Sequence, residues 1–164
     1  MNTELEIESK VIGKTINVLL IEDNPGDANL VNKHLKESKD FNFEITLAKS
    51  VKEAVSIISN EGAGFFNVFD VVLLDLGLPD CIGIRTFKEI KARLLGVPII
   101  VLTGSVLERN DLKTCLDTAS GFLVKGYIDS TTLENAIISG INKQKEYEKI
   151  MYLINHRQKT EVCG

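Results

Sequence analysis

The chain has 164 residues, of which 44% are hydrophobic and 26% are charged, a composition typical of an ordinary globular protein with one hydrophobic core. Lys and Arg total 19 against 23 Asp and Glu, and this net charge of −4 lacks the basic excess of a nucleic-acid-binding surface. No segment approaches the roughly 18 apolar residues of a membrane span, and 1–14 is polar without an apolar secretory core. We therefore expect a cytoplasmic protein with no direct contact to nucleic acid or membrane.

Short apolar segments predict strands, and most of them lack the alternation of a strand with one face in water. The predicted strands are 17–21, 43–47, 71–74, 97–102 and 121–124. Helices are predicted between them from apolar spacings of three and four residues, and two cap residues, Asn24 and Ser50, mark helix starts. These helices begin near 25, 51, 84, 107 and 130, and a loop is expected at 60–67. Strands that alternate with helices predict an α/β fold with a parallel sheet.

Polar side chains follow directly after every predicted strand but the second. Glu22 and Asp23 follow the first strand, and Asp75, Thr103 and Lys125 follow the third, fourth and fifth. The carboxyl ends of parallel strands meet at one edge of the sheet, where such folds bind their ligands. We therefore expect these five side chains to gather in one site.

The residue types at this edge suit phosphoryl chemistry. Its three carboxylates would repel one another, and a hard divalent cation such as Mg²⁺ relieves that repulsion because it prefers oxygen ligands. Asp75 is the predicted nucleophile, since carboxylates can form acyl phosphates. Thr103 is expected to donate a hydrogen bond to a phosphoryl oxygen, and Lys125 to balance its charge. The sequence contains no Ser/His/Asp triad, Walker-type loop or dinucleotide fingerprint.

In these motifs the sequence resembles the receiver domains of bacterial and archaeal response regulators, over residues 16–142. The resemblance is carried by Val18–Asp27 (VLLIEDNPGD), Val71–Asp80 (VVLLDLGLPD) with Gly83, Val101–Gly104 (VLTG) and Phe122–Lys125 (FLVK). It implies a doubly wound, flavodoxin-like (βα)5 fold whose five parallel strands lie in the order 2-1-3-4-5. It also implies a phosphoprotein of a two-component phosphorelay, which promotes only its own phosphorylation and dephosphorylation and is otherwise no enzyme.

Carried over residue by residue, the resemblance implies that Asp75 accepts a phosphoryl group from a sensor histidine kinase or a phosphotransfer protein. Asp23 would bind Mg²⁺ directly, and Glu22 would bind it through water or as a second ligand. Asp75 itself and the backbone carbonyl of Gly77 would complete the protein's share of the metal ligands.

The resemblance also implies a switch. Thr103 and Lys125 would contact the phosphoryl group, and Phe122 holds the position of the family's aromatic switch residue. The face made by the fourth helix, fifth strand and fifth helix would then change and bind a downstream effector protein or domain. The family usually has a proline after the lysine, whereas Gly126 follows Lys125 here. Phe122 lacks the hydroxyl of a tyrosine, so the expected switch is purely steric.

Two other functions use the same residues. A phosphatase of the haloacid dehalogenase type also combines a nucleophilic Asp, a Thr or Ser, a Lys and Mg²⁺. It needs a second Asp two residues after the nucleophile, where this chain has Gly77, and its motifs come in another order. A scaffold that keeps the receiver fold but works without phosphate stays open as well, although an intact Asp75, Thr103 and Lys125 argue against it.

The chain is expected to divide into a flexible tail at 1–15, a receiver domain at 16–145 and a helical extension with a tail at 146–164. The last helix is expected to continue beyond the domain, and seven of its residues follow one another at spacings of four and three, typical of the seam of a two-stranded coiled coil. They are Leu133, Ile137, Gly140, Gln144, Tyr147, Met151 and Ile154. Two interpretations stay open here: a homodimer through this helix, or a helix end or linker without a partner.

Overall fold

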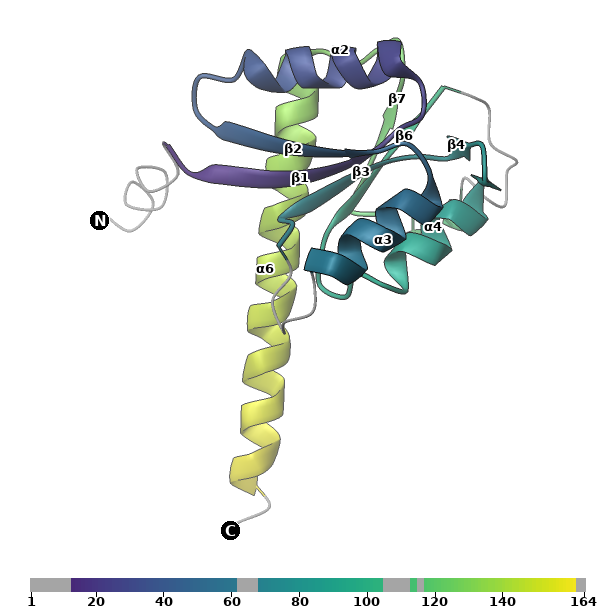
Figure 1. Ribbon diagram of the computed structural model, residues 1–164. Coiled ribbons are helices and arrows are strands. Elements are labelled where there is room, and N and C mark those ends of the chain that lie inside the picture. The colour runs from purple at the N-terminus through teal and green to yellow at the C-terminus, as the bar shows by residue number, and fades with distance from the viewer. Residues whose placement is uncertain (1–12, 62–67, 105–112, 115–116, 162–164) are drawn as a thin grey trace.

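The computed structural model describes residues 13–61, 68–104, 113–114 and 117–161 (Figure 1). Its centre is a five-stranded sheet in which every neighbouring pair of strands is parallel, in the order β2-β1-β3-β6-β7. The strands are β1 (Thr15–Ile21), β2 (Asn42–Ala48), β3 (Val71–Asp75), β6 (Ile99–Thr103) and β7 (Gly121–Val124). Counted along the chain, this is the predicted order 2-1-3-4-5, which is therefore confirmed.

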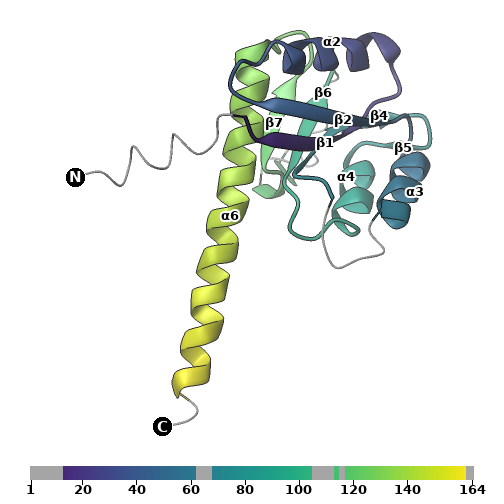
Figure 2. The same ribbon diagram turned by 60° about the vertical axis from the view of Figure 1, so that its left-hand side comes forward.

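Helices cover both faces of the sheet, as the doubly wound prediction requires. One face packs against α2 (Pro25–Lys36) and the first half of α6 (Ser130–Glu161). The other face packs against α3 (Val51–Glu61) and α4 (Ile84–Lys91). Both views show the two groups on opposite sides of the strands and the far half of α6 projecting away from them (Figures 1 and 2).

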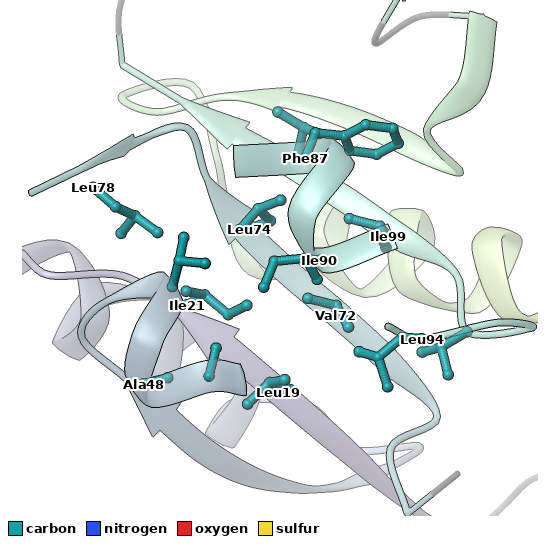
Figure 3. Packing of buried hydrophobic residues seen from close by; sticks show 14 of the residues in the cluster. Leu19, Ile21, Ala48, Val72, Leu74, Leu78, Phe87, Ile90, Leu94 and Ile99 are labelled. Carbon is teal, nitrogen blue, oxygen red and sulfur yellow. The ribbon is translucent and has the colours of Figure 1, made fainter. Parts of the chain in front are cut away.

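The alternation of side chains along the strands produces two separate cores. Leu19 and Leu74 lie in the layer under α3 and α4, whereas Leu20 and Leu73 lie in the layer under α2 and α6. Figure 3 shows the first of these layers, in which Phe87, Ile90 and Leu94 lie against the strands. Because both faces of the central strands are covered, every residue of β3 and β6 is buried. This explains the continuous apolar runs in the sequence.

The predicted helix caps are confirmed. Asn24 Oδ1 accepts hydrogen bonds from the amides of Gly26 and Asp27 at 2.8 and 3.2 Å, and Pro25 is the first residue of α2. Ser50 Oγ likewise accepts from the amide of Glu53 at 3.1 Å at the start of α3. These bonds satisfy amides that the first turn of a helix leaves without intrahelical partners.

Four of the five strands have boundaries that differ from the predicted ones by one or two residues, and the start of β6 has a clear physical reason. The strand expected at 97–102 begins at Ile99 in the structure. Pro98 has no N–H to donate to a neighbouring strand, which favours a strand start directly after it.

Some predictions concern residues that the structure does not describe. The helix near 107–116 falls mainly on 105–112 and 115–116, the loop at 60–67 on 62–67, and the flexible tail at 1–15 on 1–12; these ranges lie outside the described residues. Within the described part of the chain, no helix is both long and apolar enough to cross a membrane.

Candidate functional site

The carboxyl edge of the sheet gathers the residues singled out by the sequence. Glu22 and Asp23 follow β1 directly, Asp75 and Thr103 are the last residues of β3 and β6, and Lys125 follows β7. The strand register aligns these ends, since Ile21 pairs with Leu74, Asp75 with Leu102, and Thr103 with Val124.

Lys125 is the centre of the charge arrangement. Its Nζ lies 2.5 Å from Glu22 Oε2, 3.0 Å from Asp75 Oδ2 and 3.0 Å from Asp27 Oδ2. Burial by itself lowers the pKa of Lys125, but its close contacts with these three carboxylates outweigh burial and hold the pKa above its ordinary value. Lys125 is therefore a permanent cation, anchored by the hydrogen bond from its own amide to the Thr103 carbonyl at 2.8 Å.

Glu22 is buried although it carries a carboxylate. Its Oε1 accepts a hydrogen bond from the Asn24 amide at 3.0 Å. Its Oε2 is buried without a well-aligned hydrogen-bond donor among the described residues, and the Lys125 ammonium lies against it. Burial raises the pKa of Glu22 above its ordinary value of 4.5, and the charge of Asp75 adds to this effect, although the bonds from Lys125 and Asn24 oppose it.

Asp75 is 7% exposed at the end of β3, so it is reachable only from the open edge of the sheet. Its Oδ1 accepts a hydrogen bond from the Gly77 amide at 3.2 Å, while its Oδ2 faces Lys125. One carboxylate oxygen is thus held by backbone and the other by a cation, which fixes the orientation of the group.

Three carboxylates come together beside the lysine. Oxygens of Glu22, Asp23 and Asp75 all lie within 4.8 Å of one another, and Asp23 is the exposed member. Lys125 supplies a single positive charge to this group, so the cluster keeps a strong attraction for a further cation.

Thr103 and Phe122 lie along the adjoining strands. Thr103 is buried at the end of β6. Phe122, in β7, is partly buried and packs against the core layer that contains α3 and α4.

The loop after Lys125 uses glycine where the family usually has proline. Gly126 has φ +88°, a left-handed conformation that a residue with a side chain rarely adopts. The described residues contain no cis peptide bond, so the Lys125–Gly126 bond is trans.

Sequence comparison agrees with this fold. A family model for the response regulator receiver domain matches residues 18–138. The chain belongs to the response regulator receiver family. Solved structures agree: the phosphorylated cyanobacterial phytochrome response regulator RcpA superimposes with a TM-score of 0.60 at 26% identity, over 76% of this chain and 90% of that chain. The Mn²⁺-bound form of response regulator Rcp1 gives 0.60 at 25% identity, over 74% and 89%.

Curated relatives contain similar receivers. The cell cycle transcriptional regulator CtrA of Caulobacter vibrioides is 30% identical over 112 residues, which cover 67% of this chain and 44% of that protein. The nitrate/nitrite response regulator protein homolog of Haemophilus influenzae is 32% identical over 123 residues, which cover 73% and 54%. The chain thus spans about half the length of these relatives.

The acidic pocket of this receiver fits a divalent metal ion. Receiver domains bind Mg²⁺ in such a pocket, and the oxygen donors present here are those that Mg²⁺ prefers. The buried Oε2 of Glu22 and the exposed carboxylate of Asp23 provide donors on the inner and outer sides of the pocket.

Two residues that make long-range contacts in the structure were given no role by the sequence analysis. Asp27, in the first turn of α2, contacts Lys125 at 3.0 Å. Asp80, beyond β4 (Gly77–Leu78), accepts hydrogen bonds from the amides of Val51 and Lys52 at 3.0 and 2.9 Å at the start of α3. Both residues lie within quoted motifs, VLLIEDNPGD and VVLLDLGLPD, but their contacts join segments 98 and almost thirty residues apart, for which the sequence has no local signal.

Proposed function

We propose that Asp75 of this receiver domain accepts a phosphoryl group from a histidine kinase or phosphotransfer protein, in the presence of Mg²⁺, and that phosphorylation switches a protein-interaction surface. The observation that carries the proposal is the position of Asp75: buried to 7% exposure, oriented by the Gly77 amide and Lys125, and within 4.8 Å of two further carboxylates. An isolated surface aspartate has none of these features.

In the proposed reaction a carboxylate oxygen of Asp75 attacks the phosphorus atom of a phosphohistidine. The new O–P bond forms as the P–N bond breaks, and the electron pair of that bond leaves with the imidazole of the donor. A Mg²⁺ ion held by Glu22, Asp23, Asp75 and the Gly77 carbonyl would neutralise charge on the phosphoryl oxygens.

Lys125 would take part without any change of its own charge. In the structure its ammonium is shared among three carboxylates, and after transfer a phosphoryl oxygen would compete with them for it. Thr103, next to the same edge, is the proposed hydrogen-bond donor to that group.

The proposed switch runs through β7. Movement of Thr103 toward the phosphoryl group would leave space for Phe122 to turn inward, which changes the surface beside β7. A downstream effector protein or domain that prefers the changed surface then shifts the population toward it.

The partners of this receiver and its cellular location are proposed from its family and its relatives. Histidine kinases and effectors are the partners of response regulators, and a cytoplasmic location follows from that role. We also propose the division into a tail at 1–15, a receiver at 16–145 and an extension at 146–164. The named relatives include a transcriptional regulator, but direct DNA binding by this chain is not part of the proposal.

The test is the intact mass of the protein after incubation with acetyl phosphate and with a panel of phosphorylated kinases, with and without Mg²⁺. We expect the mass to rise by one phosphoryl group only with Mg²⁺. Asp75→Asn should abolish the gain, because the amide is a poor nucleophile, whereas the exposed control Asp40→Asn should keep it.

A phosphoryl group that persists on Asp75→Asn would refute Asp75 as the acceptor. If no donor modifies the folded, Mg²⁺-binding protein, the phosphate-independent scaffold replaces the present proposal.

A further inference from the structure

Helix α6 has two halves with different surroundings. In the first half Leu133, Ile137 and Ile141 are buried against the sheet. Gly140 lies so close to Pro98 and Ser120 that an added Cβ would meet their Cβ atoms at 3.5 Å. This half is therefore fixed to the receiver body.

The second half leaves the receiver body. Both views show α6 continuing as a straight projection beyond the sheet (Figures 1 and 2). About 19 residues, from 143 to 161, belong to this projection, roughly 28 Å at the rise of an α-helix. Most of the stability of a helix in a protein comes from the packing of one face, so a packed partner would stabilise this projection.

The projecting half carries an apolar stripe, defined here as Tyr147, Ile150, Met151 and Ile154. Their exposed fractions are 60%, 49%, 37% and 45%. The spacings of three, four and seven residues place all four side chains on one side of the helix. A stripe of large apolar side chains in water is unfavourable and favours association.

The stripe follows the spacing of a coiled-coil seam. Gln144, Tyr147, Met151 and Ile154 occupy successive seam positions, with Ile150 beside them. The same seam runs through the first half of α6, where the receiver body covers it. Beyond the body this face of the helix is exposed and can bind a partner.

The charges beside the stripe indicate which partner fits it. Lys143 lies on one flank of the seam, and Glu148, five residues later, lies on the other. Between two parallel, in-register copies, flanking residues with this separation face each other, so each Lys143 would lie opposite a Glu148 of the second copy. Gln144 Nε2 donates a hydrogen bond to Glu148 Oε1 at 3.0 Å, which holds that carboxylate alongside the seam.

An antiparallel arrangement fits less well. It brings flanking residues of the same side together, so that Lys143 would approach Arg157 of the second copy and like charges would meet. Two copies of the helix therefore bring opposite charges together when they are parallel, and like charges together when they are antiparallel.

We propose that this chain forms a parallel, in-register homodimer through residues 143–157 of α6, with the apolar stripe as its seam and Lys143–Glu148 ion pairs across it. The proposal goes beyond phosphorylation of Asp75 and does not depend on it. It places both receiver bodies at the same end of the paired helices.

The first test is the molar mass of the full, unphosphorylated chain by light scattering over a wide range of concentrations. We expect twice the chain mass of 18.1 kDa. Ile154→Glu places a charge in the seam and should give a monomer, whereas Tyr152→Glu, on the opposite side of the helix, should leave the dimer intact. Both positions are exposed, so far-UV circular dichroism should show an unchanged fold. A monomeric wild type, or dissociation by both variants alike, overturns the proposal.

The second test concerns direction and register. Lys143→Glu alone and Glu148→Lys alone should each weaken the dimer by about tenfold, because both symmetry-related pairs become repulsive. The double variant Lys143→Glu/Glu148→Lys should restore wild-type affinity. With Cys81, Cys115 and Cys163 changed to Ser, Met151→Cys should form a disulfide-linked dimer on oxidation. Absence of both rescue and cross-link rules out the parallel register.

Discussion

At the scale of single residues, burial disfavours the ionised Glu22 carboxylate, whereas contact with the Lys125 ammonium favours it. The Glu22 carboxylate is buried where its ionised form is unfavourable, and burial raises its pKa above 4.5. Lys125 offsets part of this cost but is shared with Asp75 and Asp27. A buried acid that is costly in the metal-free protein is a suitable ligand for a cation, because binding relieves the cost.

The burial of Glu22 predicts how the stability of the protein depends on pH. A raised pKa in the folded state means that Glu22 contributes stability below pH 4.5 that is lost as the pH rises through its folded-state pKa. With EDTA present, wild type should therefore lose stability relative to Glu22→Gln as the pH rises above 4.5. The measurement is the free energy of unfolding in urea over a pH series.

Mg²⁺ should reverse the order near neutral pH, since wild type gains binding energy that the amide cannot supply. Glu44→Gln, at an exposed position on β2, should follow wild type throughout. A Glu22→Gln variant whose relative stability falls with rising pH would contradict the assignment.

At the scale of elements, Asp80 connects the segment after Asp75 to the start of α3. Cys81 and Ile82 form β5, which pairs antiparallel with β4, and Asp80 lies at the turn between them. Its two oxygens accept from two amides of the first turn of α3. Burial alone would raise the pKa of Asp80, but the amides of Lys52 and Val51 outweigh it and lower the pKa below its ordinary value.

Asp80→Ala should destabilise the protein by about 1 kcal/mol, the usual cost of a lost helix cap. The change in denaturant midpoint at constant m-value measures it. Asp80→Asn should keep part of the stability, since the amide oxygen can still accept, and Asp40→Ala is the control at an uninvolved exposed aspartate. Equal losses in the Asp80→Ala and Asp40→Ala variants would show that the cap contributes nothing.

At the scale of the whole molecule, the first half of α6 covers one face of the sheet, and its second half projects beyond the receiver. The residues that cover the sheet end at Ile141, and the described side chains from 145 to 157 are exposed. The receiver's core is thus complete without the projection.

A chain that ends after Lys145 should therefore unfold cooperatively, within a few degrees of the full chain, and should still accept a phosphoryl group on Asp75. Its melting temperature should not depend on concentration, whereas that of a dimeric full chain should. Calorimetry at several concentrations distinguishes the two. Aggregation or non-cooperative melting of the shortened chain would mean that the receiver needs the extension.

The resemblance to receiver domains implied the strand order, and the sequence predicted the fold class and the residues at the carboxyl edge. These follow from local signals: unbroken apolar runs such as Val71–Leu74, the caps Asn24 and Ser50, and the polar residue after each strand. Strand ends in a parallel sheet necessarily meet, so chain order alone predicted that Glu22, Asp75 and Lys125 would gather.

The partners of each side chain, in contrast, are visible in the folded structure alone. The sharing of Lys125 among three carboxylates, the unfavourable burial of Glu22 and the cap by Asp80 depend on contacts between segments far apart in the chain. The same holds for the stripe on α6: its spacing is visible in the sequence, but only the packed fold shows where the sheet stops covering the helix. Burial and side-chain pairing arise from contacts in the folded chain, so local sequence patterns do not reveal them.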